Sequence, residues 1–226
     1  MWKAIACDLD GTLTNEDHVV DLEVLALLRM AEKSGLRFIL SSARTRLELR
    51  AVSALFGTTG PIVAENGGIV WNIKADQEKV LGELRKVQEA YKLISSRITD
   101  LQRLMENYRE TDIVIWGRRT QEIAPVVESE KLDVHLLEGT YATYITDTSV
   151  NKGIGLKTAS DMIGIDPSQV AAIEDAQNDI ALLKIAGAGY AVGNADQRLK
   201  DVATKVMSRP YGGGCADAIR EILKAA

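Results

Sequence analysis

The sequence predicts an α/β fold, with a doubly wound, Rossmann-like parallel sheet core interrupted by an inserted α+β domain. Short apolar segments alternate with helical segments in residues 1–82 and again in residues 151–226. Such alternation is typical of parallel strands joined by helices that cover both faces of a sheet. Residues 83–150 break the alternation, because helical and strand signals follow one another there in mixed order. We therefore expect a core built from the two outer parts and a separate domain between them.

Strand and helix signals succeed one another regularly in the outer parts. Short apolar runs typical of buried strands occur at residues 4–7, 38–40, 61–64 and 170–173. Helical signals lie at residues 21–35, 47–55 and 154–164, and further strand and helix signals at residues 189–192, 198–203 and 216–223. Asp21 is a suitable helix N-cap and Gly35 a suitable stop signal. A turn at Asn66-Gly67-Gly68 and a hairpin of residues 69–71 with 79–81 complete the first part.

The middle of the chain has a different character. Residues 83–108 predict a charged helical stretch, which the pair Ser95-Ser96 can interrupt. Beyond it we expect a helix at residues 123–131 and strands at residues 113–116, 134–137 and 141–145. We therefore place the core at residues 1–82 and 151–226, and the inserted domain at residues 83–150.

Composition and charge exclude several classes of partner. The chain has 226 residues, 46% of them apolar and 26% charged, which is enough for a packed core. A formal net charge of -5 without dense Lys/Arg runs gives no footprint for nucleic acid or an anionic membrane. We expect a small-molecule ligand, a monomer or homodimer and, because the first apolar run is brief, a cytoplasmic location without signal peptide or membrane span. Cys7 and Cys215 lack metal-type spacing and are expected to be reduced packing residues.

Acidic residues follow two of the predicted strands, at the edge where parallel sheets bind ligands. Asp8 and Asp10 end the first strand and, because side chains alternate along a strand, are expected to point the same way, which favours a shared divalent cation. Asp175, Asn178 and Asp179 follow a later strand. A second group of carboxylates at a second strand end suits Mg²⁺, which takes oxygen ligands.

Two further segments suit an anion. Ser41-Ser42-Ala43-Arg44 places hydroxyls and successive backbone N–H groups at a strand-to-helix turn, which predicts an anion nest. Lys152, within Asn151-Lys152-Gly153, is placed to neutralise a phosphoryl group. Each segment alone has an ordinary interpretation, such as an Asp-Gly turn, a helix cap or a solvated lysine. Together they supply the nucleophile, metal ligands, anion nest and cation that phosphoryl transfer requires.

These segments resemble the four motifs of the haloacid dehalogenase superfamily, and the resemblance covers the whole chain. It rests on Asp8-Leu9-Asp10-Gly11-Thr12, which is highly specific, and on Ser42, Lys152 and Asp175 through Asp179, which are weak alone. Glu65-Asn66-Gly67-Gly68 and an insert between the second and third motifs resemble subclass IIB, which carries an inserted α+β cap domain. Within that subclass, the short cap and the total length are most similar to phosphoglycolate phosphatases, with sugar-phosphate phosphatases close behind.

The resemblance implies a Mg²⁺-dependent phosphatase of a small phosphorylated metabolite. Asp8 would attack phosphorus to form an aspartyl phosphate, and Asp10 would protonate the leaving oxygen and later activate water. The implied ligands of Mg²⁺ are Asp8, the backbone carbonyl of Asp10, Asp175 and Asp179. The implied substrate contacts are Ser42, the backbone N–H of Ala43, Lys152 and Asn178. The cap would exclude water and choose the leaving group.

Two residues depart from the family pattern. Ala43 stands where the second motif usually has glycine, but it keeps the N–H group. Glu174 stands where the fourth motif usually has glycine, and it adds bulk and negative charge beside the metal site. If Glu174 extends its strand, it should point away from Asp175. A weakened affinity for Mg²⁺ is the hypothesis that follows, to be tested with Glu174→Gly.

Three other functions fit parts of the pattern. A mutase similar to phosphomannomutases would return the phosphoryl group to a sugar. A signalling module similar to receiver domains also uses acidic residues and lysine at strand ends, but the Asp8-x-Asp10 arrangement and the insert do not suit it. A member that binds phosphate without catalysis would be consistent with Ala43 and Glu174. The run Tyr211-Gly212-Gly213-Gly214 is interpreted as a turn into a helix, and His18 has no evident partner.

Overall fold

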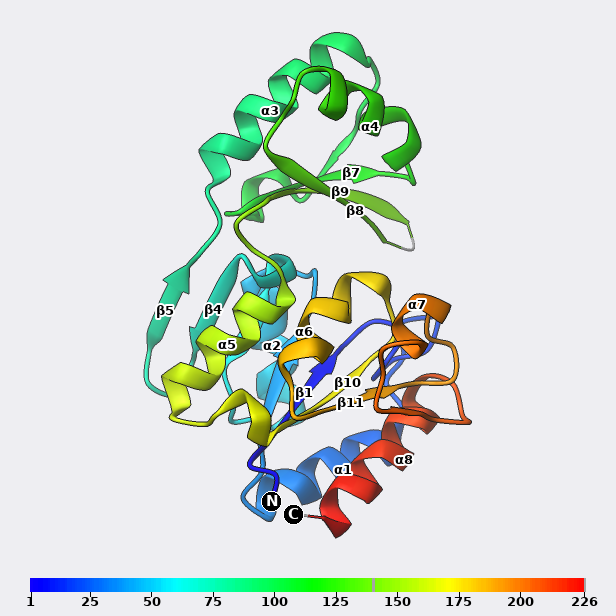
Figure 1. The fold of residues 1–226 in the computed structure, drawn as a ribbon. Helices are drawn as coiled ribbons and strands as arrows, with labels where there is room; N and C mark the ends of the chain where they lie inside the picture. The colour runs from blue at the N-terminus through cyan, green and yellow to red at the C-terminus, as the bar shows by residue number, and fades with distance from the viewer. Residues whose placement is uncertain (140, 226) are drawn as a thin grey trace. The chain divides into compact units, whose positions relative to one another are not determined.

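The computed structural model describes residues 1–139 and 141–225 (Figure 1). The chain forms two compact units, one of residues 1–79 with 151–226 and the other of residues 80–150. The predicted α/β fold is confirmed, because the first unit is built on a large, mainly parallel sheet with helices packed on it. Within the described ranges, no helix has both the length and the apolar character needed to cross a bilayer.

The sheet of the first unit has the strand order β12-β11-β10-β1-β2-β3-β4-β5. Its strands are β1 (Ala4–Asp8), β2 (Arg37–Ser41), β3 (Ile62–Ala64), β4 (Ile69–Asn72), β5 (Gln77–Val80), β10 (Val170–Glu174), β11 (Ala188–Ala191) and β12 (Lys205–Val206). Neighbouring strands from β12 to β3 are parallel, and β4 is antiparallel to β3. The central strand β1 therefore has parallel neighbours on both sides, which brings three carboxyl-terminal strand ends together.

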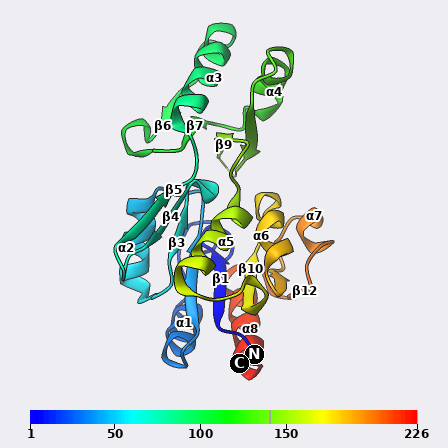
Figure 2. The same ribbon diagram turned by 60° about the vertical axis from the view of Figure 1, so that its left-hand side comes forward.

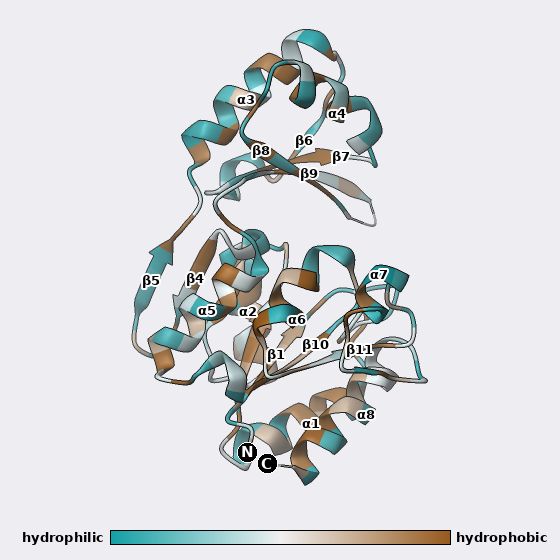
Figure 3. Ribbon diagram, in the orientation of Figure 1, coloured by the Kyte–Doolittle hydropathy of each residue, from teal (hydrophilic) through white to brown (hydrophobic). Residues whose placement is uncertain are grey.

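Helices cover both faces of this sheet. They are α1 (Leu22–Lys33), α2 (Arg46–Phe56), α5 (Lys152–Ile163), α6 (Ile180–Ile185), α7 (Gln197–Lys200) and α8 (Tyr211–Lys224). Helix α1 packs against α8 and α5 against α6, and Figures 1 and 2 show these pairs on opposite faces. Figure 3 shows hydrophobic and hydrophilic colours alternating around α1, as expected of a helix with one buried side. Every residue of β1 and β10 is buried between the two layers.

The predicted turn at Asn66-Gly67-Gly68 is confirmed. It is a short 3₁₀ turn, η1 (Glu65–Gly67), between the antiparallel strands β3 and β4. Gly67 has φ 99°, and a Cβ atom there would lie 2.1 Å from the carbonyl oxygen of Asn151. Only glycine allows this approach, which packs the turn directly onto the start of α5.

The second unit contains a four-stranded sheet with the order β6-β7-β9-β8. Its elements are α3 (Leu84–Arg97), β6 (Arg103–Leu104), η2 (Glu106–Tyr108), β7 (Asp112–Trp116), α4 (Thr120–Ser129), β8 (Val134–Glu138) and β9 (Ala142–Asp147). Figure 1 shows α3 and α4 on the same face of this sheet. The core between them consists of Val87, Ala90, Ile94, Ile113, Ile115, Ile123, Val134 and Ile145. This unit therefore has a hydrophobic core of its own.

The expected helical stretch over residues 83–108 is wrong beyond Arg97. Ile98 is already extended, Asp100 has φ 65°, and Arg103 pairs with Ile115 of β7 as part of strand β6. Ile98 and Leu101 still pack against the core of the second unit. Pairing of β6 with β7 replaces the last turns of the expected helix. The helical spacing of Ile98 and Leu101 therefore reflects their burial in an irregular segment and not a helical backbone.

Candidate active site

Three side chains end the three central strands of the first unit. Asp8 is the last residue of β1, Ser41 of β2 and Glu174 of β10, and all three are buried. Asp8 and Ser41 are direct partners in the register of the sheet. Parallel pairing thus gathers the first, second and fourth predicted segments at one edge, as the sequence predicted.

Lys152 lies at the centre of the acidic group. It is the first residue of α5, its side chain is only 2% exposed, and its Nζ lies 2.5 Å from Oδ1 of both Asp8 and Asp179. Asn151 caps the helix by accepting a hydrogen bond from the N–H of Ile154 (3.0 Å). Burial alone would lower the pKa of Lys152, but Asp179 and Asp8 raise it well above its ordinary value. The lysine is therefore a fixed positive charge.

Asp175 follows β10 directly and faces the loop after β1. Its Oδ1 accepts a hydrogen bond from Thr12 Oγ1 (2.8 Å), and a Cβ atom at Gly11 would lie 2.4 Å from its Oδ2. Burial, with a smaller contribution from Asp179, raises the pKa of Asp175 to about 7. Asp179 Oδ2 accepts the N–H of Ala176 (3.1 Å), which folds the fourth segment into a tight turn. The close approach at Gly11 explains why that position in the first segment has no side chain.

The carboxylate of Asp10 has different partners from that of Asp8. Arg44 donates two hydrogen bonds to it, and His18 Nδ1 lies 2.8 Å from its Oδ1. Burial raises the pKa of Asp10, but the hydrogen bonds from Arg44 and the contact with His18 lower it overall. Strand alternation does not apply to Asp10, because β1 ends at Asp8. The sequence offered no signal for His18, which reaches Asp10 through a loop closed by the bridge Thr14–Val20.

The second segment forms the loop between β2 and α2. Ser42 is buried, its Oγ accepts the N–H of Arg44 (3.2 Å), and its carbonyl accepts the N–H of Asn66 (3.2 Å). Ala43 lies between Ser42 and Arg44 on the same loop. Asn178 donates from Nδ2 to Oδ1 of Asn66 (3.2 Å). Asn66, which was predicted to lie in a turn and belongs to the segment that resembles subclass IIB, thus connects the second segment to the fourth.

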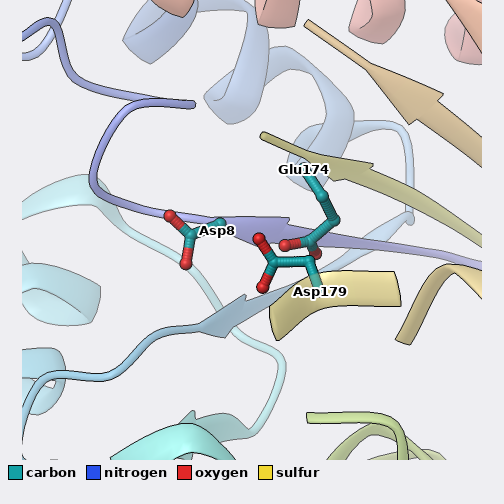
Figure 4. A group of neighbouring side chains, drawn as sticks. All are labelled: Asp8, Glu174 and Asp179. Atoms are coloured by element: carbon teal, nitrogen blue, oxygen red, sulfur yellow. The ribbon is translucent and has the colours of Figure 1, made fainter. Parts of the chain in front are cut away.

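Glu174 lies inside the acidic group. It is fully buried, and Figure 4 shows its carboxylate turned toward those of Asp8 and Asp179. One ligand oxygen from each of these three residues lies within 4.8 Å of the other two. Burial raises the pKa of both Asp8 and Glu174 well above their ordinary values, and Lys152 opposes this effect at each. The carboxylates therefore lack sufficient positive charge around them.

The donor set fits a hard divalent cation. Asp8, Glu174, Asp175 and Asp179 supply only oxygen atoms, and Lys152 is the single basic side chain that the described residues place among them. Both carboxylate oxygens of Glu174 lack a hydrogen-bond partner in the described structure. A buried carboxylate in that state needs a cation nearby. Mg²⁺ is the expected ion, because it prefers carboxylate and carbonyl oxygens.

Two other sequence features have structural explanations. Tyr211-Gly212-Gly213-Gly214 forms the first turn of α8, as interpreted, and a Cβ atom at Gly214 would lie 2.2 Å from the carbonyl oxygen of Arg209. Cys7 and Cys215 are free and buried, with their sulfur atoms 3.8 Å apart. Both features therefore pack the core.

Comparisons with known proteins match most or all of the chain. The model of haloacid dehalogenase-like hydrolases matches residues 5–122 and 121–219. A phosphoglycolate phosphatase of Methanothermobacter thermautotrophicus is 34% identical over 224 residues, which are 98% of this chain and 99% of that protein. A Thermoplasma acidophilum structure has a TM-score of 0.83 at 23% identity and covers 100% of this chain and 98% of its own. A subclass IIB sugar phosphatase structure has a TM-score of 0.80 at 17% identity, with 97% and 98% covered.

Proposed function

Because the chain belongs to the haloacid dehalogenase-like hydrolases and is a phosphoric monoester hydrolase, we propose that it is a Mg²⁺-dependent phosphatase acting through an aspartyl phosphate on Asp8. The proposed substrate is a small monoester, with phosphoglycolate first. The observation that carries the proposal is the ion pair of 2.5 Å between Asp8 Oδ1 and Lys152 Nζ. A carboxylate at a strand end beside a fixed positive charge is the arrangement that a nucleophile attacking a phosphate ester requires, which supports the proposal.

In the proposed first step, a carboxylate oxygen of Asp8 forms a bond to phosphorus while the bond between phosphorus and the ester oxygen breaks. Asp10 donates to that leaving oxygen the proton that it accepted from water at the end of the preceding turnover. Burial raises the pKa of Asp8 and favours the neutral carboxyl that cannot attack, and the ion pair with Lys152 opposes this effect. Ser42 and the N–H of Ala43 would bind the phosphoryl oxygens, and Asn178 would contact the substrate.

In the proposed second step, water attacks phosphorus and the bond to Asp8 breaks. Asp10 accepts the proton of that water. Arg44 and His18 lower the pKa of Asp10 and hold it in the ionised form that this step requires.

Mg²⁺ would be held by Asp8, the backbone carbonyl of Asp10, Asp175 and Asp179. When bound, it neutralises the charge that collects on the transferring phosphoryl group. The observation that supports this site is the excess of buried carboxylates over the one lysine among them.

Phosphoglycolate as the substrate is supported by the similarity to the phosphoglycolate phosphatase of Methanothermobacter thermautotrophicus, which matches nearly the whole chain. All of the residues above lie in the first unit. We therefore propose that residues 83–150 act as the cap domain, which chooses the leaving group but takes no part in the bonds at phosphorus.

The experiment that tests the proposal measures inorganic phosphate released from phosphoglycolate, glycerol phosphates and hexose phosphates, with Mg²⁺ or with EDTA. We expect release from phosphoglycolate with Mg²⁺ only. Borohydride reduction during turnover should convert the acyl phosphate at position 8 to homoserine, which peptide mass spectrometry identifies.

Asp8→Asn and Asp166→Asn form the matched pair of variants for this assay. Asp166 is an exposed N-cap in the same unit, so Asp166→Asn should retain activity and Asp8→Asn should lose it. Activity that persists in Asp8→Asn would rule out the nucleophile. Transfer of phosphate from one hexose phosphate to another position, without release, would show a mutase instead.

A further inference from the structure

Glu174 is the residue of the site that the proposed reaction does not use. It ends β10 between β1 and β11, and its side chain is 0% exposed. Glu174 does extend the predicted strand, but this does not take its side chain out of the site. Its carboxylate instead joins those of Asp8 and Asp179, as Figure 4 shows.

Among the residues that the structure describes, Lys152 is the basic side chain that pairs with Glu174, and it is already committed to other residues. Lys152 Nζ lies 2.5 Å from oxygens of both Asp8 and Asp179, but 3.9 Å from Oε2 of Glu174. That distance is too long for a hydrogen bond. Neither oxygen of Glu174 has a hydrogen-bond partner among the described residues. A carboxylate enclosed in this way is strongly unfavourable unless a cation neutralises it.

The charges of the whole group point in the same direction. Three carboxylates, those of Asp8, Glu174 and Asp179, surround one lysine in the described structure, and the charge of Asp175 acts on the same group. Asp10 is separate, because Arg44 and His18 already bind it. One lysine leaves most of this negative charge uncompensated, and a divalent cation would compensate part of it.

We propose that Glu174 is a ligand of this cation, in addition to Asp8, Asp175 and Asp179. The inference rests on the proposed function only in taking the cation to be the cofactor of the phosphatase. This inference reverses the effect on cation affinity that the sequence suggested for Glu174. From the sequence, the bulk and charge of Glu174 beside the metal site suggested weaker binding of the cation, whereas a carboxylate turned toward Asp8 and Asp179 would strengthen that binding. The glutamate would thus let the protein retain its cation at a lower free concentration than a glycine at this position.

Isothermal titration calorimetry with Mg²⁺ and with Mn²⁺ tests this directly. We expect Glu174→Gln to weaken the affinity for either cation by at least about tenfold. Asp196→Asn is the matched control, because Asp196 is exposed, its charge raises the pKa of Asp175, and asparagine keeps an oxygen that can accept the N–H of Gln177. It should weaken the affinity much less. Equal losses in the two variants, or no loss in Glu174→Gln, would overturn the ligand assignment.

Thermal unfolding and terbium luminescence give readouts that do not depend on activity. Without cation, Glu174→Gln should melt at a higher temperature than the wild type, because a buried unpaired charge is removed. Its cation-induced rise in melting temperature should be smaller. The luminescence lifetime of bound Tb³⁺ in H₂O and D₂O should report about one more coordinated water in Glu174→Gln. An unchanged water count argues against ligation.

These outcomes separate the inference from the proposed function. If the wild type releases no phosphate from any ester, the proposed function fails, while the affinities and the water count still decide the role of Glu174. If the wild type releases phosphate and Glu174→Gln binds cations normally, only the inference fails.

Discussion

Arg44 donates two hydrogen bonds to Asp10, from Nε to Oδ2 and from Nη2 to Oδ1, each 2.7 Å long. This two-point contact fixes both the direction and the charge of the carboxylate. It comes from a residue on the loop after β2, so it joins the first and second segments of the site.

Arg44→Lys should therefore impair the reaction more than a conservative change normally does. Lysine cannot form the two parallel hydrogen bonds, and we expect kcat to fall about tenfold or more, since general acid–base catalysis contributes about 10²–10⁴-fold. Arg44 lowers the pKa of Asp10, so its loss should move the acidic limb of the kcat profile to higher pH. Arg46→Lys, two residues later at the start of α2, is the control and should leave the pH profile of kcat unchanged. An unmoved acidic limb in Arg44→Lys would contradict this role.

Lys152→Met should destabilise the protein in the absence of divalent cation. Methionine keeps much of the length and removes the charge, which leaves Asp8 and Asp179 unpaired in a buried site. Breaking a buried ion pair costs about 3–5 kcal/mol, and urea unfolding with EDTA measures it. Lys157→Met on the same helix is the control. Its side chain is 66% exposed, so the change should stay within about 0.5 kcal/mol. Equal stability of the two variants would show that Lys152 is not needed to hold the group together.

Gly67→Ala should lower both stability and activity. The new Cβ would lie 2.1 Å from the carbonyl oxygen of Asn151, so the turn or the start of α5 must move. Gly164→Ala is the matched control, because its φ of 65° is also left-handed but no atom lies within 4 Å of the new Cβ. We expect the control to cost about 1 kcal/mol and Gly67→Ala clearly more, with a fall in kcat that the control does not show. Equal losses of activity in Gly67→Ala and Gly164→Ala would contradict the proposed link between the turn at Gly67 and Lys152, the first residue of α5.

The stability of the second unit should depend on the ionisation of Asp147. Burial alone would raise the pKa of Asp147, but hydrogen bonds from Lys86 and from the N–H groups of Ser149 and Glu83 lower it to about 2. A carboxyl whose pKa is depressed in the folded state stabilises above its unfolded pKa of about 3.9, and loses that contribution as the pH falls through the folded value.

Asp147→Asn should therefore be less stable than wild type at pH 7, and the difference should shrink between about pH 4 and pH 2. Circular dichroism of urea unfolding at several pH values measures this. Asp161→Asn, at an exposed pair on α5, serves as the reference for an ordinary surface carboxylate. A difference that stays constant down to pH 2 would exclude the linkage.

The sequence predicted the fold of the first unit and the strand ends of the site because local signals determine both. Apolar runs mark β1 and β10, and parallel pairing then brings Asp8 and Glu174 to one edge. The partners of Asp10 depend instead on a loop that turns at His18 with φ 59°, which no periodic pattern encodes. The end of α3 was also missed, since Ile98 and Leu101 keep helical spacing while the backbone leaves the helix.

The direction of the Glu174 side chain is another feature that local sequence signals could not predict. The apolar run predicted a strand that ends at Ile173, and a direction away from Asp175 was expected only if Glu174 extended that strand. Glu174 is the last residue of β10, and whether its side chain faces solvent, core or ligands depends on Asp179 and Lys152, which approach from the following turn and from α5. Such tertiary surroundings are not contained in the spacing of one segment.

The chain returns from the second unit at Asn151, one residue before Lys152, and the carbonyl of Asn151 is the atom that Gly67 packs against. The point in the chain at which an insert would be exchanged therefore adjoins the lysine of the proposed reaction centre. A foreign insert that replaces residues 80–150 but preserves Asn151, Lys152 and Gly67 should keep the proposed chemistry of the host, whereas a graft cut two residues later should remove it.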